Sequence, residues 1–233
     1  MLKLIKNTFK KLKKRNWKET VIWLLIAFVF LANSSHEKYP DEFDNICGGW
    51  LIRNGKVLYR DFFTHHNPLA YYLSAIITFF SGQSFVKFRI ILALFWFSFS
   101  LLFFNYFKKR FGKKISQYYL IFTAVFSVAA TFNWLHMMLA DSLATFLFIP
   151  VFLMMITFLL EKEKVKDQDL ILINLMNFFV FLSTQSYSYL VAFLNLFLGY
   201  LYLKDNYKKL KLKRIFKVGV LIILPYLIFG SYL

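Results

Sequence analysis

Long apolar blocks separated by short basic loops constrain this chain more than any other feature of its sequence. The blocks run for about 16–20 residues, roughly the length that a helix needs to cross a hydrocarbon core. In lipid a spanning segment must satisfy its own backbone hydrogen bonds, as a helix does. Hydrophobic residues make up 59% of the chain and its mean hydropathy is +0.53, unlike a soluble domain. The sequence therefore predicts an all-α, polytopic transmembrane helical bundle.

The blocks predict about seven spans with the amino terminus in the cytoplasm. The spans are expected at residues 17–32, 88–107, 115–132, 142–160, 170–184, 187–203 and 218–233. The first follows a basic segment, residues 1–18, and we expect an uncleaved anchor, although a cleaved signal peptide would look similar. Because the chain ends within its seventh predicted span, it is expected to be a minimal module or a fragment of a longer protein.

The apolar run at residues 68–80 is short for a span, and the basic residues indicate how it lies. If the run does not cross, the cytoplasmic segments are residues 1–18, 108–114, 161–169 and 204–217, which hold 23 of the 29 Lys and Arg residues. This asymmetry follows the positive-inside rule, and a crossing at 68–80 would weaken it. We therefore expect a long first external loop, residues 33–87, with an interfacial helix, in a multi-pass plasma membrane protein.

The net charge of +17 does not indicate a nucleic-acid partner, because the basic residues lie in short clusters between apolar blocks. The single cysteine, Cys47, excludes an internal disulfide, and no Cys/His spacing suggests a zinc site. The composition thus favours a partner in the bilayer itself.

Turn residues divide the first external loop into two short juxtamembrane helices. The Tyr-Pro-Asp sequence at residues 39–41 predicts a turn into a helix at 41–53, with Asp41 as its cap. An Asn-Gly pair at 54–55 is expected to end that helix. An Asn-Pro pair at 67–68 is expected to start the interfacial helix.

Acidic residues follow two of the predicted spans on the external side. Asp41, Glu42 and Asp44 lie within one helical turn, and Asp141 lies at the outer end of the fourth span. Carboxylates from separate loops can supply a general base and a metal site or an orienting group. The alternative is that Asp41, Asp44 and Asp141 only cap helices, a role that is compatible with catalysis.

The first loop resembles that of the GT-C glycosyltransferases, especially the branch of protein mannosyltransferase-like and aminoarabinose transferase-like proteins. The resemblance lies in an Asp-Glu pair at 41–42, the sequence Asn-Gly-Lys-Val-Leu-Tyr-Arg-Asp-Phe-Phe at 54–63, and His-His-Asn-Pro-Leu-Ala-Tyr-Tyr-Leu at 65–73. Gly82 and Arg89 also fit the pattern. The resemblance covers residues 17–160 well, and the rest of the module, to residue 233, by hydropathy alone.

This resemblance implies transfer of a sugar from a polyprenyl-phosphate-linked donor to an unknown acceptor at the outer face of the membrane. The implied catalytic residues are Asp41, Glu42 and Asp141, with Asp41 as the base. Family members are metal-dependent or metal-independent, so a divalent metal at Asp41 and Asp141 is possible and no other cofactor is expected. The candidate substrate-binding residues are Arg89, Arg60, Asp61, His65, His66 and Lys87.

The charged candidates among these residues have a simpler structural explanation, whereas one of His65 and His66 could orient an acceptor or a carboxylate. The departing polyprenyl phosphate is an anion that Arg89, Lys87 or Arg60 could stabilise, yet the first two could instead extend to lipid headgroups. Arg60 could pair locally with Asp61. Among the other polar and aromatic residues, His136 is expected to bond a loop carbonyl, and aromatic residues at span ends are expected to be membrane-interface anchors: Trp50, Trp134, Tyr71, Tyr72, Tyr187 and Tyr189.

Two other functions fit the composition. The first is a non-catalytic membrane protein, such as a lipid carrier or a transport subunit, which would place polar residues or broken helices within its spans. The polar residues found there are few, chiefly Asn174, Asn177 and Asn195. The second is a truncated, inactive glycosyltransferase fragment.

Overall fold

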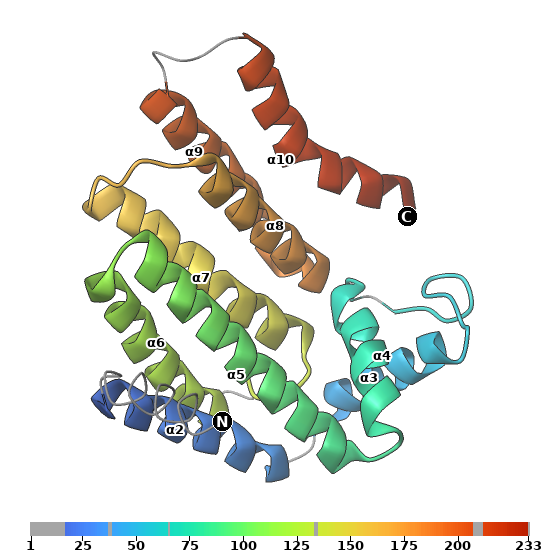
Figure 1. Cartoon of the computed structure of the whole chain (residues 1–233). Helices are drawn as coiled ribbons and strands as arrows, with labels where there is room; N and C mark the ends of the chain where they lie inside the picture. The colour runs from blue at the N-terminus through green and yellow to red at the C-terminus, as the bar shows by residue number, and fades with distance from the viewer. Residues whose placement is uncertain (1–16, 37–38, 65, 133–134, 207–211, 233) are drawn as a thin grey trace, which may run out of the picture. The chain divides into compact units, whose positions relative to one another are not determined.

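The computed structural model describes residues 17–36, 39–64, 66–132, 135–206 and 212–232 (Figure 1). These residues are mainly helical, and they contain no β-strand beyond one isolated bridge between Leu58 and Phe62. The all-α prediction is therefore confirmed for the described chain. Five helices in it are long and apolar enough to cross a membrane, which is compatible with a multi-pass membrane protein.

The described helices, in chain order, are α2 (Trp17–Ala32), α3 (Pro40–Arg53), α4 (Leu69–Ser81), α5 (Phe85–Arg110), α6 (Lys113–Phe132), α7 (Ala140–Leu160), α8 (Asp167–Ser183), α9 (Ser188–Asn206) and α10 (Leu212–Tyr232). Short 3₁₀ turns follow α2 and precede α9. The five helices of spanning length are α2 with its 3₁₀ turn, α5, α6, α7, and α9 with its 3₁₀ turn. At 1.5 Å per residue, the 13 residues of α4 reach only about 20 Å, less than the hydrocarbon core of about 30 Å.

Proline and glycine set the two ends of α3. Pro40 takes the first helical position, where a missing N–H is tolerated. Tyr39 is the N-cap, with extended backbone and no side-chain capping bond, so the prediction that Asp41 caps this helix is wrong. Asp41 lies inside the first turn because the helix begins at the proline. At the other end Asn54 is the C-cap and Gly55 has a φ of 84°, which confirms the predicted left-handed stop.

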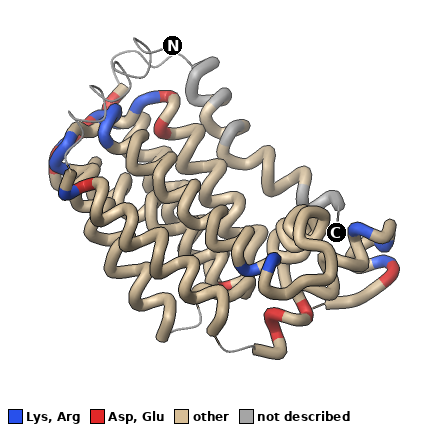
Figure 2. The backbone as a smooth tube through the Cα atoms, turned by 60° about the horizontal axis from the view of Figure 1, so that its bottom comes forward, with Lys and Arg blue, Asp and Glu red and all other residues tan. Residues whose placement is uncertain are grey.

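The chain forms two compact units, and each is described by itself. The first unit comprises Met1–Lys38 and Ser81–His136, and the second comprises Tyr39–Phe80 and Met137–Leu233. In both, charged residues gather mainly at helix ends and in connecting loops (Figure 2). This distribution leaves the middle of the long helices apolar, as crossing a bilayer requires.

Three helices, α2, α5 and α6, pack against one another in the first unit (Figure 1). Their contacts are aromatic: Trp23 meets Phe104 edge to face at 5.4 Å between ring centroids, and Phe107 stacks on Tyr119 at 4.9 Å. Such pairs contribute about 0.5–1.5 kcal/mol each beyond their buried area. Buried aromatic rings thus contribute to the packing of all three helices in this unit.

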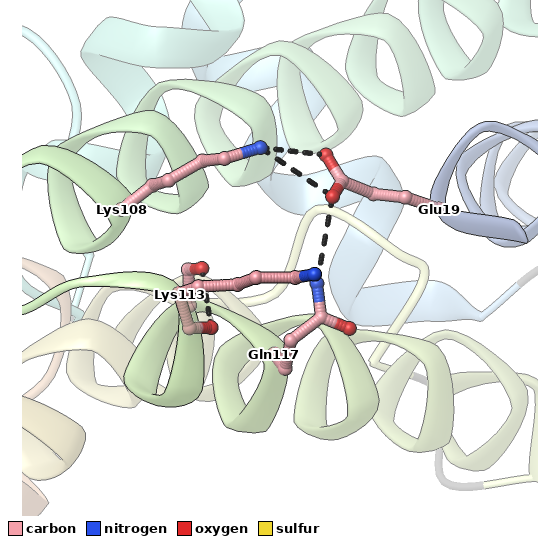
Figure 3. A network of polar contacts seen from close by, with 5 residues as sticks. Glu19, Lys108, Lys113 and Gln117 are labelled. Atoms are coloured by element: carbon pink, nitrogen blue, oxygen red, sulfur yellow. Dashed lines mark hydrogen bonds and ion pairs between the residues drawn. The ribbon is translucent and has the colours of Figure 1, made fainter. Parts of the chain in front are cut away.

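A buried carboxylate joins the three helices at the end where α5 meets α6 (Figure 3). Glu19 of α2 is 5% exposed, and its two oxygens lie 3.1 and 3.4 Å from Nζ of Lys108. The side-chain amide of Gln117 on α6 also donates to Glu19, at 3.4 Å. Lys108 itself is 46% exposed, so only one of the two charges is shielded from water.

This difference in burial predicts an asymmetric response to mutation. Lys108→Ala leaves the buried Glu19 charge without its cation and should lower the free energy of unfolding by about 3 kcal/mol. Glu19→Ala releases a lysine that can reach water, and should cost about 1–2 kcal/mol. Thermal or denaturant unfolding in detergent micelles measures both changes. A larger loss for Glu19→Ala than for Lys108→Ala would contradict the arrangement.

In the second unit α8 lies between α7 and α9, and α10 packs on α8 and α9 (Figure 1). Polar side chains link three of these helices inside their apolar stretch. The Asn177 amide donates to Oδ1 of Asn195 at 2.6 Å, and the Asn195 amide donates to the Tyr226 hydroxyl at 2.8 Å. Because these groups bond to one another, they act as connections between helices.

Candidate functional site

The candidate site begins at the first turn of α3, in the second unit. Asp41 and Glu42 both lie in this turn, where acidic side chains stabilise a helix. Their environments differ sharply, because Asp41 is exposed whereas Glu42 is fully buried. Asp41 can therefore meet a substrate, and the carboxylate of Glu42 faces the protein.

Two side chains of α3 hold the backbone of Met138 from both sides. Oε1 of Glu42 accepts the Met138 N–H at 3.2 Å, and the side-chain amide of Asn45 donates to the Met138 carbonyl at 3.0 Å. The same Asn45 amide donates to the carbonyl of Asp41, also at 3.0 Å. We call these three bonds the Met138 clamp.

The Met138 clamp links the start of α3 to the start of α7. Met138 lies two residues before Ala140, the first residue of α7, and Asp141 is the second residue of that helix. Leu139 is the N-cap and makes no side-chain capping bond, so Asp141 is not the cap that the structural alternative assumed. Asp141 is exposed, like Asp41. Two accessible carboxylates thus lie in the first turns of two helices whose starts are tied together.

A buried tyrosine fixes a third carboxylate of α3. Tyr71 of α4 is 1% exposed, and its hydroxyl donates to Oδ2 of Asp44 at 2.6 Å. The hydroxyl of Thr64 lies 2.6 Å from the same tyrosine oxygen. Burial, and then donation to Asp44, raise the pKa of Tyr71, so its hydroxyl remains a donor. The prediction that Tyr71 is a membrane-interface anchor is wrong, because its ring and hydroxyl lie inside the protein.

Arg60 and Asp61 pair with each other on the exposed loop between α3 and α4. Nε and Nη2 of Arg60 donate to the two oxygens of Asp61 at 3.0 Å each. Asp61 also accepts the N–H of Val57 at 2.8 Å. The Arg60 bond and then the Val57 bond lower the pKa of Asp61 to about 2. Arg60 thus pairs locally with Asp61, and Asp61 has a role in shaping the loop.

Hydrogen bonds hold the end of this loop together and connect it to α8. The N–H of His66 donates to the Thr64 hydroxyl at 3.1 Å, and Tyr59 donates to the carbonyl of His66 at 2.8 Å. The Asn67 amide donates to the carbonyl of Phe181 in α8 at 2.5 Å. The other predicted histidine, His65, lies outside the described residues.

Three predicted residues belong to the first unit. Arg89 is 2% exposed, its Nη1 donates to the carbonyl of His36 at 2.5 Å, and its guanidinium lies 4.5 Å from the Phe85 ring centre. Lys87 is exposed in the first turn of α5. Nδ1 of His136 lies 3.1 Å from the carbonyl of Ala130, which belongs to α6, so its partner is a helix carbonyl and the prediction of a loop carbonyl is wrong.

Asn45, Thr64, Asn67 and Tyr71 were not predicted as parts of the site. Their hydrogen-bond partners are distant in sequence or are backbone atoms. The spacing of residues along the chain indicates neither kind of partner. Among the described residues no group of three or more His, Cys, Asp or Glu side chains could hold a metal ion.

Comparison of the chain with protein-family models, with curated proteins and with solved structures gave no match. The class that the fold itself defines is an all-helical chain with several helices able to cross a membrane. The site adds accessible carboxylates at two helix starts, tied together through the Met138 clamp.

The burial of Glu42 predicts that its role is positional. Glu42→Gln keeps an acceptor for the Met138 N–H and should keep the fold of the wild type, with the activity proposed below retained within about threefold. Glu42→Ala leaves this buried N–H without its acceptor and should cost about 1–3 kcal/mol. Unfolding in detergent micelles, followed by an activity assay of both variants, tests this. A folded Glu42→Gln protein without activity would make Glu42 a catalytic group.

Proposed function

We propose that this chain is a glycosyltransferase that moves a sugar from a polyprenyl-phosphate-linked donor to an acceptor at the outer face of the plasma membrane. The observation that supports this most is the Met138 clamp. It holds the exposed Asp41 at a fixed place beside the segment that enters α7 and carries Asp141. A rigid support of this kind is what a catalytic carboxylate requires.

In the proposed reaction Asp41 acts as a general base. Its carboxylate takes the proton of an acceptor hydroxyl, and the acceptor oxygen forms a bond to the anomeric carbon of the donor sugar. The bond between this carbon and the phosphate oxygen breaks, and its electron pair leaves with the polyprenyl phosphate. The proposed role of Asp141 is to orient the acceptor or the sugar. Arg60, which is paired with Asp61 and has a side chain 69% exposed, is the proposed contact of this unit for the departing anion.

The proposed topology has seven spans, with the amino terminus in the cytoplasm. It adds α8 and α10 to the five helices of spanning length and keeps α4 at the outer interface. The short α4 exposes an apolar face that includes Ile76, Phe79 and Phe80, at 60%, 64% and 69% exposure. Such a face would lie in the headgroup region, where a lipid-linked donor presents its sugar.

Sealed membrane vesicles of known orientation test the proposal. Vesicles containing the full chain would be supplied with a panel of labelled polyprenyl-phosphate sugars, and the label entering lipid, glycan and protein fractions would be measured. We expect transfer of one donor sugar when the outer face is accessible. No transfer from any donor in either orientation would overturn the proposed function.

A further inference from the structure

A dense group of basic side chains lies at the turn between α5 and α6. Residues 108–114 contain five basic residues, and Lys109, Lys113 and Lys114 are exposed. Gly112, with a φ of 89°, allows α6 to start directly after α5. The last turn of α5 and the first turn of α6 therefore present their charges together (Figure 2). We call residues 109–114 the basic turn.

The unit that carries the basic turn has little negative charge of its own. The described part of this unit contains eight Lys and Arg side chains and one acidic side chain, Glu19. Glu19 is engaged with Lys108 inside the helix bundle. The net positive charge is thus concentrated at a surface, where it attracts anions.

Helix polarity adds to this attraction at one side of the turn. The basic residues that end α5 face the negative end of their helix dipole, which is favourable. Lys113 and Lys114 instead begin α6, where the dipole is already positive and the first N–H groups have no partner within the helix. An anion above the turn would be stabilised by the lysines and by these N–H groups together.

Aromatic residues indicate that the basic turn lies at the level of the lipid headgroups. Nζ of Lys114 lies 5.9 Å from the Tyr118 ring centre, and the Arg110 guanidinium lies 4.6 Å from the Phe111 ring centre. Tyr118 is 49% exposed, and Trp17, at the start of α2, is 69% exposed. Exposed tyrosine and tryptophan at the ends of spanning helices are typical of the bilayer interface.

We propose that the basic turn binds the phosphodiester headgroup of an anionic glycerophospholipid in the adjacent leaflet. The phosphate supplies the negative charge that the first unit lacks, and the acyl chains pack along α5 and α6. Basic residues near an anionic membrane surface contribute about fivefold in affinity each. This binding does not depend on the proposed glycosyltransferase activity.

Lipid binding to the purified full chain tests this by native mass spectrometry from a neutral detergent. Dioleoyl phosphatidylglycerol and dioleoyl phosphatidylcholine would be titrated separately. We expect the first adduct of phosphatidylglycerol to bind at least tenfold more tightly than that of phosphatidylcholine. The double variant Lys113→Gln/Lys114→Gln should lose at least fivefold of this preference, and Lys113→Arg/Lys114→Arg should retain it.

A matched control separates a site from overall charge. Lys162→Gln/Lys164→Gln also removes two positive charges, but from a loop in which acidic residues, including Glu161 and Glu163, alternate with the lysines. Its preference for phosphatidylglycerol should match the wild type. Equal binding of the two lipids by the wild-type chain, or equal losses in the two glutamine variants, would overturn the proposal. Thermal unfolding of each variant in the same detergent identifies any that has lost its fold, and the Arg variant then supplies the comparison.

Discussion

Replacing Asp41 by Asn should reduce sugar transfer by a factor of about 10²–10⁴, the usual contribution of a positioned general base. The substitution keeps the shape of the side chain and removes its ability to accept the acceptor proton. It leaves the fold intact, because the Met138 clamp uses the backbone carbonyl of Asp41 and the side chains of Glu42 and Asn45. Initial rates with a labelled polyprenyl-phosphate sugar measure the loss.

Two further variants complete this test. Asp141→Asn should also reduce transfer, by a smaller factor if Asp141 orients the acceptor. Glu163→Gln is the matched control, since it neutralises an exposed carboxylate beyond the opposite end of α7 and should transfer at the wild-type rate. Full activity of the Asp41→Asn variant would remove Asp41 from the mechanism.

Replacing Gly49 by Val should disrupt the packing of α3 on α4 in the second unit. A Cβ atom at this position would lie 2.5 Å from Cβ of Ser74 and 2.6 Å from the backbone nitrogen of Ala75 in α4. Backbone atoms cannot rotate away, so α3 and α4 would have to separate. We expect a loss of about 3 kcal/mol, the upper end of the usual range for overpacking, and a loss of transfer as the bond between Tyr71 and Asp44 breaks.

Cys47→Val is the control for the Gly49 variant. It places the same branched side chain on the same helix at an exposed position, so its effect on helix propensity is similar and the close contact with α4 at Gly49 is not involved. Thermal unfolding in detergent micelles compares the two proteins. Equal stability of Gly49→Val and Cys47→Val would contradict the close packing of α3 on α4.

Local sequence accounts for much of the helical architecture. The predicted first span and α2 have the same bounds. The helix α3 begins one residue before its predicted start and ends where predicted, because Pro40 and Asn54-Gly55 set its two ends through their own backbone preferences. The predicted capping roles of Asp41 and Asp141 are wrong, because Tyr39 and Leu139 take the two N-cap positions. Neither tyrosine nor leucine is a typical capping residue, so the residue types did not indicate these positions. For Asp41 the cause is local, because α3 begins at Pro40.

The contacts of the site depended on packing that the sequence does not display. Tyr71 at the start of an apolar helix has the same local sequence whether it faces lipid or the protein, and here it bonds to Asp44. Asn45 gives no signal apart from lying one turn after Asp41, and its partner Met138 is 93 residues away. Glu42 was predicted together with Asp41, but only the fold separates the exposed carboxylate from the buried one.

Donor turnover tests the central proposal most directly, because it does not require the acceptor to be known. Membranes containing the wild-type chain or the Asp41→Asn variant, at equal abundance, would be incubated with the panel of polyprenyl-phosphate sugars, and the polyprenyl phosphate released would be quantified by mass spectrometry. The proposed function predicts release from one donor by the wild type, at least 100-fold above the variant. Equal release by the two, or none by the wild type from any donor, would contradict it.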